Sequence, residues 1–500
     1  MMRRIVYFLF LVLTLSCTSR PELPKDYVDL EVYPFIFPDY TNVTVPSNIA
    51  PLTFMTTDTV SAGIIAEVVD ASGKHFVYGV DKTIVIPQDE WEEMKADSKG
   101  KDLEITIFSV HKTSGEWARF MPFHIHIAPE EIDEYISYRL IEPSYMLYNK
   151  MSIVQRQLSS YEETEIYNNQ VSGAGGKGQC INCHSYQNYS TNNMLFHVRV
   201  TDGGTVIVVD GKPKKVNLKR PYTISAGVYP AWHPTEQLIA FSTNNTSQWF
   251  HTFDRNKVEV FDNESDLILY DIARDSVSVI ANDSTRLEVF PTWTPDGKYL
   301  YYCSADSWKN DSIDFRTDYV NLHYNIYRKS FDAKTLSFGE EELVYVCDSI
   351  GKSASLPRIS PDGRYLAFAE GPYGCFNIWH HEADIKVLDL NKLEQATSPS
   401  LDNNASIDAT GINSKWYAES YPSWSSNGKW LMCASRRDDG NYSRVYISYF
   451  DGDSIHKAFE IPQDNPRHNT LRLKSYNRPE FMKEPVRVSI QDFAKIVKGE

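Results

Sequence analysis

The hydrophobic and polar positions of this chain predict β-strands over most of its length. In the second half, a short apolar run, a tight turn and another apolar run recur together, as YPAWHPTEQLIAFST from Tyr229, FPTWTPDGKYLYYCSA from Phe290, LPRISPDGRYLAFAE from Leu356 and YPSWSSNGKWLMCAS from Tyr421. Each copy is typical of a hairpin with a turn of the Pro-Asp-Gly kind. A further strand signal follows in each unit, such as DLILYD from Asp266. The pattern predicts roughly three to four strands per unit.

The spacing of these copies indicates a repeat architecture. Their prolines stand at 230, 291, 357 and 422, which are 61, 66 and 65 residues apart, and YNRPEFM around Pro479 is a fainter copy 57 residues later. Units of this length with several strands are typical of β-propeller blades. The segment FHVRVTDGGTVIVVDGKPKKVNL from 196 to 218 carries strands that could close the ring with the C-terminal end. We expect about six blades, with five or seven as the alternatives.

The first half predicts different units. Residues 18 to 128 contain the strand-like runs AGIIAEVVD, KTIVIP, LEITIFSVH and FMPFHIHIA, which fit a small antiparallel β-sandwich. Pro129 is followed by acidic residues, which is typical of the start of a helix. A second segment with a helical pattern begins at Tyr145. The mainly β chain therefore divides into a signal peptide (1–17), a sandwich-like domain (18–128), a helical linker (129–193) and a propeller (194–500).

The repeated W/I-S/T-P-D-G-K/R-Y/W-L-A-F pattern resembles the blade repeat of TolB-like periplasmic propellers, over roughly residues 220 to 490. The resemblance implies a propeller fold and protein partners in the bacterial cell envelope. It says little about activity, because propellers host binding and catalysis alike.

The first residues predict export. MMRRIVYFLFLVLTLSC has cationic Arg3 and Arg4, an apolar run from Ile5 to Leu15 that is too short to span a bilayer, and then Cys17. This arrangement resembles the lipobox of bacterial lipoproteins, although Thr14 stands where that box usually has leucine. We expect Cys17 to be lipidated and to anchor the mature protein in a membrane of the envelope, facing the periplasm. The alternative is an ordinary signal peptide with an incidental cysteine.

Composition narrows the possible partners. The formal net charge of −16 argues against nucleic acid and against an anionic membrane face. A hydrophobic content of 42% is enough for extensive cores. The sequence contains neither a GxSxG nor an HExxH motif, so no enzyme class is indicated.

One short cluster carries candidate cofactor chemistry. Cys180-Ile181-Asn182-Cys183-His184 matches Cys-x-x-Cys-His, the attachment motif of c-type haem. Two thiols three positions apart on one helical turn would reach both vinyl groups of one porphyrin, and His184 would offer its imidazole to the iron from the same side. Covalent attachment takes place after export, which the signal peptide supplies. The motif therefore predicts one haem c, bound by Cys180 and Cys183 with His184 as the proximal ligand.

The cluster has alternatives. A zinc site could use both cysteines with His184, His197 or a more distant histidine, and a disulfide between Cys180 and Cys183 could simply close the loop. The distal haem ligand is open between Met194 and His197, which lie eleven and fourteen residues after Cys183. His124 and His126 are remote candidates.

Two functions follow from these interpretations. The first is envelope electron transfer or redox sensing by a haem-bearing propeller lipoprotein. The second is a non-redox scaffold that binds a protein, peptide or glycan, with zinc or a disulfide in the cluster. We expect the recurring tryptophans to pack in the core, and the later cysteines to be buried, apolar residues. These residues are Trp232, Trp293, Trp424, Trp430, Cys303, Cys347, Cys375 and Cys433.

Overall fold

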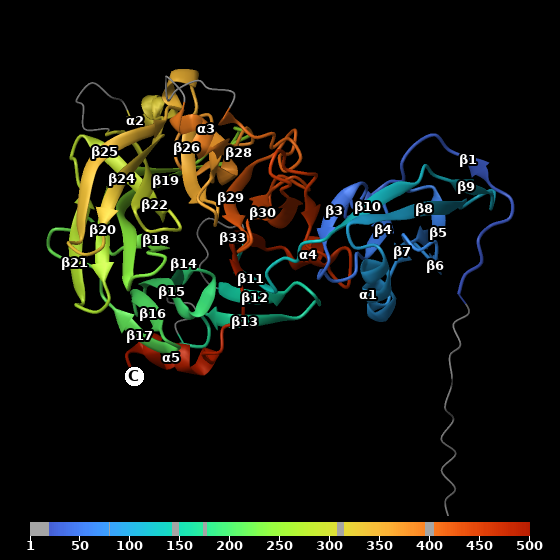
Figure 1. Cartoon of the computed structure of the whole chain (residues 1–500), viewed down its shortest axis with the longest axis horizontal. Helices are drawn as coiled ribbons and strands as arrows, with labels where there is room; N and C mark the ends of the chain where they lie inside the picture. Colours follow the sequence, from blue (N-terminus) through green and yellow to red (C-terminus); the bar gives the residue numbers. More distant parts are fainter. Residues whose placement is uncertain (1–19, 80, 143–149, 174–177, 308–314, 396–404) are drawn as a thin grey trace, which may run out of the picture.

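The computed structural model describes residues 20–79, 81–142, 150–173, 178–307, 315–395 and 405–500. Cys17 and the signal peptide lie outside these ranges. The chain is mainly β, as the sequence predicts, and a β-rich N-terminal unit lies beside a larger ring of small sheets (Figure 1). Within the described residues, no helix has the length and apolar character needed to cross a membrane.

The N-terminal unit contains two sheets and one helix. Its larger sheet has seven strands, in the order β1-β9-β8-β10-β3 with β5 and β6 joined through β8, and its smaller sheet has the order β2-β4-β7. The strands are β1 Val28–Asp29, β2 Ile36–Phe37, β3 Val43–Pro46, β4 Phe54–Thr56, β5 Ser61–Val69, β6 His75–Tyr78, β7 Thr83–Ile84, β8 Lys101–His111, β9 Trp117–Arg119 and β10 Phe123–Ala128. The sequence did not predict the helix α1 (Gln88–Asp97), whose buried Trp91 and Met94 cover the core of this unit.

In the rest of the described chain, the strands form six small antiparallel sheets. In pairing order, the first sheet contains β13 Glu163–Asn168, β12 Ser152–Gln157, β11 Tyr135–Ile141 and β33 Ser475–Met482, and the second contains β14 Gln179–Gln187, β15 Ser190–Val200, β16 Gly204–Val209 and β17 Lys212–Val216. The third contains β18 Val228–Trp232, β19 Leu238–Phe250, β20 Val258–Asp271 and β21 Ser276–Ala281, and the fourth contains β22 Arg286–Trp293, β23 Tyr299–Asp306, β24 Asn325–Asp332 and β25 Ser337–Tyr345. The fifth contains β26 Ser353–Ile359, β27 Tyr365–Gly371 and β28 Asp384–Asp389, and the sixth contains β29 Glu419–Trp424, β30 Trp430–Ser435, β31 Arg444–Tyr449 and β32 Phe459–Glu460.

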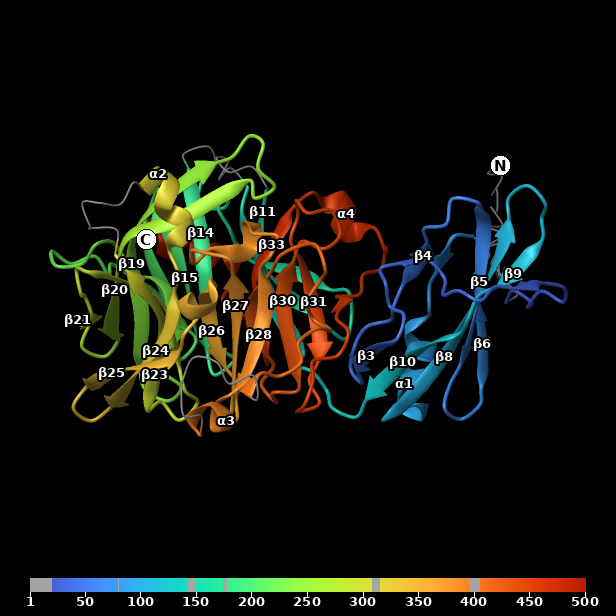
Figure 2. The same ribbon diagram turned by 90° about the horizontal axis from the view of Figure 1, so that it is seen from above.

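The sheets close into a ring. One edge strand of each sheet contacts its counterpart in the next, in the order β14, β18, β22, β26, β29 and β33, and β33 returns to contact β14. We call these six the inner strands. The last strand, β33, also pairs with β11, so the C-terminal end completes the first sheet (Figures 1 and 2). This arrangement is a β-propeller fold.

Every inner strand carries the same irregularity. In each, the pairing register shifts next to a residue with a left-handed backbone, and β14 has a second shift between Tyr186 and Gln187. The left-handed residues are Cys183, Tyr229, Phe290, Leu356, Tyr421 and Arg478, with φ between 50° and 57°. In five strands a proline follows, and in β14 the next residue is His184. A bulge frees one backbone N–H from the ladder, which is where proline is tolerated in a sheet.

The predicted helical linker is wrong. Tyr135–Ile141, Ser152–Gln157 and Glu163–Asn168 form β11, β12 and β13, and the boundary expected after residue 193 falls inside β15. The part of the prediction that falls on residues 143 to 149 lies outside the described residues. The signal for a helix start at Pro129 is not followed by a helix, because the next segment, β11, pairs with β33. This strand lies more than three hundred residues away in the sequence, and the pairing supplies hydrogen-bond partners for the backbone of β11. The remaining helices are short: α2 Phe315–Asp318, η1 Tyr319–Asn321, η2 Asp348–Ile350, η3 Asn377–Trp379, α3 Leu390–Glu394, α4 His468–Arg472 and α5 Ile490–Lys498.

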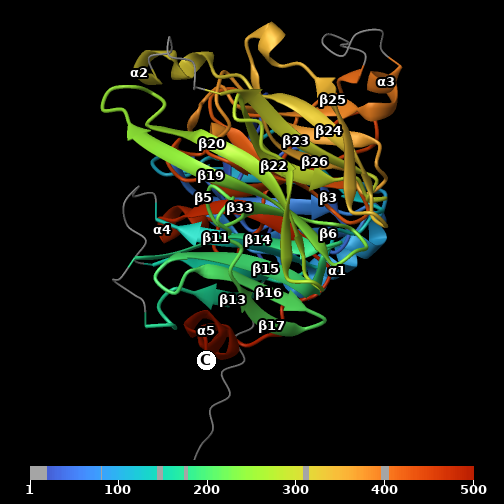
Figure 3. The same cartoon turned by 90° about the vertical axis from the view of Figure 1, so that its left-hand side faces the viewer.

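The N-terminal unit and the C-terminal helix α5 both pack against the ring. A single apolar core joins the N-terminal unit to the sheet of β29 to β32, and Glu131 accepts hydrogen bonds through its carbonyl from Asn427 and Trp430. At the other end, α5 covers β13, β16 and β17, with Phe493 and Val497 buried (Figure 3). The four predicted core tryptophans are buried, which confirms that prediction.

Candidate functional site

The predicted cofactor motif lies on a strand and not on a helical turn. Cys180, Cys183 and His184 belong to β14, and Cys183 with His184 forms the bulge of this inner strand. The motif is therefore itself a copy of the blade repeat, with His184 at the proline position and Tyr186 where Trp232 stands in the next copy. A search for proline misses this copy, although the aromatic residue two positions later and the turn after it are visible in the sequence.

His184 is fully buried. Its side chain has no exposed surface, and neither ring nitrogen has a hydrogen-bond partner in the part of the chain that the structure describes. The backbone of Ser137 lies close to the ring without reaching hydrogen-bond geometry. Burial lowers the pKa of His184 to about 3, and the charges of Arg478 and Arg139 lower it further in the same direction. The imidazole is therefore neutral at physiological pH.

The two candidate distal ligands lie on opposite faces of β15, because their positions differ by an odd number along a strand. Met194 packs in an apolar core that includes Phe196 and Phe493. His197 faces a cavity, and its Nδ1 lies 3.0 Å from Oγ1 of Thr205. Burial, and then the charge of Arg199, lower the pKa of His197 to about 3, so this ring is neutral as well.

A haem does not fit these residues as they lie. Cys180 borders a cavity of about 220 Å³, whereas sites for drug-sized ligands typically span about 300–1,000 Å³. Neither His184 nor Met194 lines that cavity, and Met194 packs with Cys180 in one apolar core among the described residues. The donor chemistry suits a metal ligand, since His184 is neutral and has no hydrogen-bond partner among the described residues, but the space does not suit a porphyrin. We therefore derive no chemistry through haem.

The described structure shows neither the zinc site nor the disulfide that are the alternatives for the motif. Within the described residues, no group of three or more His, Cys, Asp or Glu side chains is placed to hold a metal ion, which includes the predicted zinc set. Cys180 and Cys183 are free thiols, as are the four later cysteines, and all six are buried. The remote candidates His124 and His126 lie on β10 beside Glu104 and Asp102 of β8.

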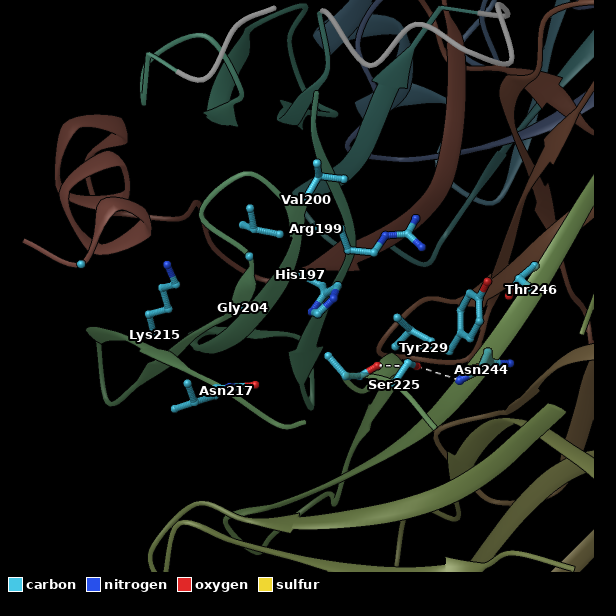
Figure 4. A pocket seen from close by; sticks show the side chains of 16 residues that line it. His197, Arg199, Val200, Gly204, Lys215, Asn217, Ser225, Tyr229, Asn244 and Thr246 are labelled. Carbon is cyan, nitrogen blue, oxygen red and sulfur yellow. Dashed lines mark hydrogen bonds between the residues drawn. The ribbon is translucent and has the colours of Figure 1, made fainter. Parts of the chain in front are cut away.

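A larger cavity lies next to the motif (Figure 4). This outer cavity measures about 590 Å³ and lies between the sheet of β15 to β17 and the strands β18 and β19. Its polar lining comprises His197, Arg199, Lys215, Asn217, Ser225, Tyr229, Asn244 and Thr246. Among the described residues, no aspartate or glutamate lines it. The outer cavity thus offers hydrogen-bond donors and positive charge in a chain whose net charge is −16.

A buried carboxylate positions one wall of the outer cavity. Asp262 accepts hydrogen bonds from Nδ2 of Asn244 at 2.8 Å and from Oγ1 of Thr246 at 3.0 Å. The backbone N–H of Asn244 also donates to Ser225 Oγ at 2.9 Å (Figure 4). Burial raises the pKa of Asp262 to about 7, while the hydrogen bonds from Thr246 and Asn244 act in the opposite direction. This carboxyl therefore titrates near neutral pH.

Arg199 connects the outer cavity to the predicted motif. Its Nη2 donates to the Cys180 sulfur at 3.5 Å, and Arg199 and Tyr229 line both the outer cavity and the smaller one beside Cys180. Tyr229 is held edge-to-face against Phe290, with ring centroids 4.7 Å apart. Sequence reasoning selected His197 for a different role and missed Arg199, whose placement depends on the pairing of β14 with β15.

No family model matches the sequence, and no curated protein matches it either. Solved structures with similar folds include the luciferin-regenerating enzyme (11% identity, 73% of this chain and 92% of that one, TM-score 0.30). The Swd1 β-propeller domain of Myceliophteria thermophila (12%, 57% and 90%, TM-score 0.30) and the tricorn protease (11%, 83% and 43%, TM-score 0.34) are others. Because these TM-scores are low, the propeller assignment depends on the strand pairing itself.

Proposed function

We propose that this chain is an exported propeller protein that binds a small, negatively charged molecule in the outer cavity. The observation that carries the proposal is the lining of that cavity, which combines Arg199 with several neutral donors and, among the described residues, has no carboxylate. The volume of about 590 Å³ is typical of ligand sites.

The polar groups suit an anion that also carries hydroxyl groups. Arg199 can bind a carboxylate or phosphate through two parallel N–H groups. His197 is neutral, and its Nδ1 is engaged by Thr205, which leaves Nε2 for a ligand. Lys215 adds positive charge to the lining, although its Nζ already donates to the carbonyl of Val497 at 2.7 Å.

We further infer that the six sheets are six blades, that the N-terminal unit is sandwich-like, and that the ring belongs with TolB-like envelope propellers. The repeated bulge and the Thr-Pro-Asp-Gly and Ser-Pro-Asp-Gly turns after β22 and β26 support this inference. Export, a lipid anchor at Cys17 and envelope protein partners are part of the proposal, and they depend on the sequence.

A propeller with covalent haem c, acting in electron transfer or redox sensing, is the second candidate. One observation favours it: His184 is a buried imidazole without partners at a position where the other inner strands have proline. Haem binding at His184 would require the neighbouring side chains, including Arg139 and Arg478, to move apart.

The haem candidate is tested by producing the protein in the periplasm together with the haem-attachment machinery. We expect no Soret band after denaturation. A band that persists in the denatured wild type and disappears in Cys180→Ala/Cys183→Ala would establish the haem candidate in place of the ligand-binding one.

The binding proposal is tested by thermal unfolding and titration calorimetry with glucose 6-phosphate, citrate and glutamate, using glucose as the uncharged control. We expect at least one anion to raise the unfolding temperature in a saturable way, with glucose inactive. Arg199→Gln should weaken that binding at least tenfold, because it removes the fork of donors. The matched control Arg274→Gln, an exposed arginine paired with Asp271 on β20, should bind as the wild type does. If none of the three anions binds, the proposal is rejected.

A further inference from the structure

The smaller cavity, beside Cys180, is lined by four arginines that come from distant parts of the sequence. Arg139 lies on β11, Arg199 on β15 and Arg478 on β33, and Arg436 follows β30 directly. We call this cavity, about 220 Å³ in volume, the arginine pocket. It is distinct from the outer cavity, although Arg199 and Tyr229 line both.

Two of these side chains are buried with unused donors. Arg139 is 8% exposed and Arg478 is 7% exposed. Within the described part of the chain, Nε of Arg139 and Nη1 of Arg478 have no hydrogen-bond partner. The contacts that these two guanidinium groups do make are long: Arg139 Nη1 to the carbonyl of Ile181 at 3.4 Å, and Arg478 Nε to Glu480 at 3.4 Å. A buried donor left unpaired destabilises the folded state, and more so when it is charged.

The other two arginines are held by the pocket wall. Arg436 stacks on Trp379, 3.2 Å from the ring centroid, and its Nη1 donates to the carbonyl of Asn441 at 2.6 Å. Arg199 donates to the sulfur of Cys180 at 3.5 Å. These contacts fix the side chains without neutralising their charge.

Carboxylates do not balance the four positive charges. Among the described lining residues, Glu142 is the single acidic side chain. Glu480 contacts Arg478, but it also forms an ion pair with Arg358, which lies outside the pocket. Like charges held together in a partly buried site repel one another, and a bound anion would both remove that repulsion and satisfy the open donors.

We infer that the arginine pocket binds a small oxyanion, either phosphate or a carboxylate. Guanidinium forks match the oxygens of both groups, and the pocket has room for an ion of this size but not for a drug-sized ligand. The inference goes beyond the proposed function, because it concerns a second cavity and stands if the outer cavity binds nothing.

The test compares thermal unfolding of the full mature protein in phosphate, in acetate and in chloride at matched ionic strength. We expect phosphate or acetate to raise the unfolding temperature in a saturable way relative to chloride. Arg139→Gln/Arg478→Gln should reduce the affinity at least a hundredfold, because it removes both open donors. The matched control Arg364→Gln, an arginine of the ring that is paired with Asp389, should keep the full effect.

The same variants show whether any loss of binding is a folding defect. In chloride, Arg139→Gln/Arg478→Gln should unfold at the wild-type temperature or higher, because it relieves repulsion in the empty pocket. Arg478→Lys keeps the charge but loses the fork, so it should bind with intermediate affinity.

Two results would overturn the inference: equal unfolding temperatures of the wild type in all three salts, or a full oxyanion effect in the double variant. His197→Gln separates this site from the outer cavity, because His197 lines only the outer one. This variant should respond to phosphate as the wild type does, even if it fails to bind glucose 6-phosphate.

Discussion

Cys183 and Tyr229 occupy the same place in the neighbouring inner strands β14 and β18, and both have a left-handed backbone, with φ of 57° and 50°. The next residue is His184 in one strand and Pro230 in the other. Since the other five inner strands have proline at this position, the bulge needs no backbone N–H there. His184 therefore contributes a buried imidazole, without a hydrogen-bond partner in the described part of the chain, at a place where the fold needs only a compact residue.

Replacing this histidine with proline should stabilise the protein. His184→Pro removes two buried ring nitrogens without partners, and it restores the residue that the repeat carries elsewhere. We expect the free energy of unfolding to rise by about 1–3 kcal/mol, measured by denaturant unfolding.

The control for that substitution is Ser185→Pro. Ser185 pairs with Leu195 in the ladder of β14 and β15, so proline at this position should destabilise the protein. A loss of stability in His184→Pro itself would contradict the prediction and would indicate that the imidazole binds a ligand in the native protein.

Asp262 should make stability fall as pH rises towards neutrality. Its carboxyl has a pKa of about 7 in the folded chain, well above the usual value of 3.8. Between these values the folded state binds more protons than the unfolded state, so the free energy of unfolding decreases with rising pH across this window. The contribution of this one group is roughly 3 kcal/mol between pH 4 and pH 7.

The substitution Asp262→Asn should remove this component, since an amide does not titrate. The measurement is the free energy of unfolding at several pH values from 4 to 8 for wild type and variant. Asp306→Asn, at the exposed end of β23, serves as the control and should reproduce the wild-type profile. Parallel pH profiles for wild type and Asp262→Asn would refute the prediction.

Removing the last strand should open the ring. A chain that ends at Leu473 lacks β33 and α5, which leaves one edge of β11 unpaired, separates β29 from β14 and uncovers β13, β16 and β17. We expect cooperative thermal unfolding to be lost and proteolysis to become rapid. Deletion of residues 499 and 500, which lie after α5, should leave the transition cooperative. A single sharp transition in the longer truncation would show that the ring does not depend on this closure.

The anchor at Cys17 gives a test of localisation. If this residue is lipidated, the mature protein should partition with membranes, and Cys17→Ser should accumulate as the unprocessed precursor. Membrane fractionation and mass spectrometry of the amino terminus measure both outcomes. Soluble wild-type protein with a free amino terminus near residue 18 would exclude the lipid anchor.

Local patterns in the sequence were enough to predict strands and turns in the four sheets of the ring that begin with β18, β22, β26 and β29. The Pro-Asp-Gly turns after β22 and β26 act through neighbouring residues, so their signals are visible without any tertiary contact. The same holds for the buried tryptophans, since alternation along a strand indicates which side faces the core. The copy in β14 was missed because His184 replaces the proline that identified the others, and the Cys-x-x-Cys-His match directed attention to a helix.

The arginines that share one pocket come together only when the ring closes. Arg139, Arg199 and Arg478 come from segments of the chain that are tens to hundreds of residues apart, and the pairing of β11 with β33 and of β14 with β15 brings them to one pocket. The same closure buries His184. The tendency of a segment to form a strand depends on adjacent residues, and it is therefore visible in the sequence. The arginine pocket depends on backbone pairing between distant segments, and no local pattern in the sequence specifies that pairing.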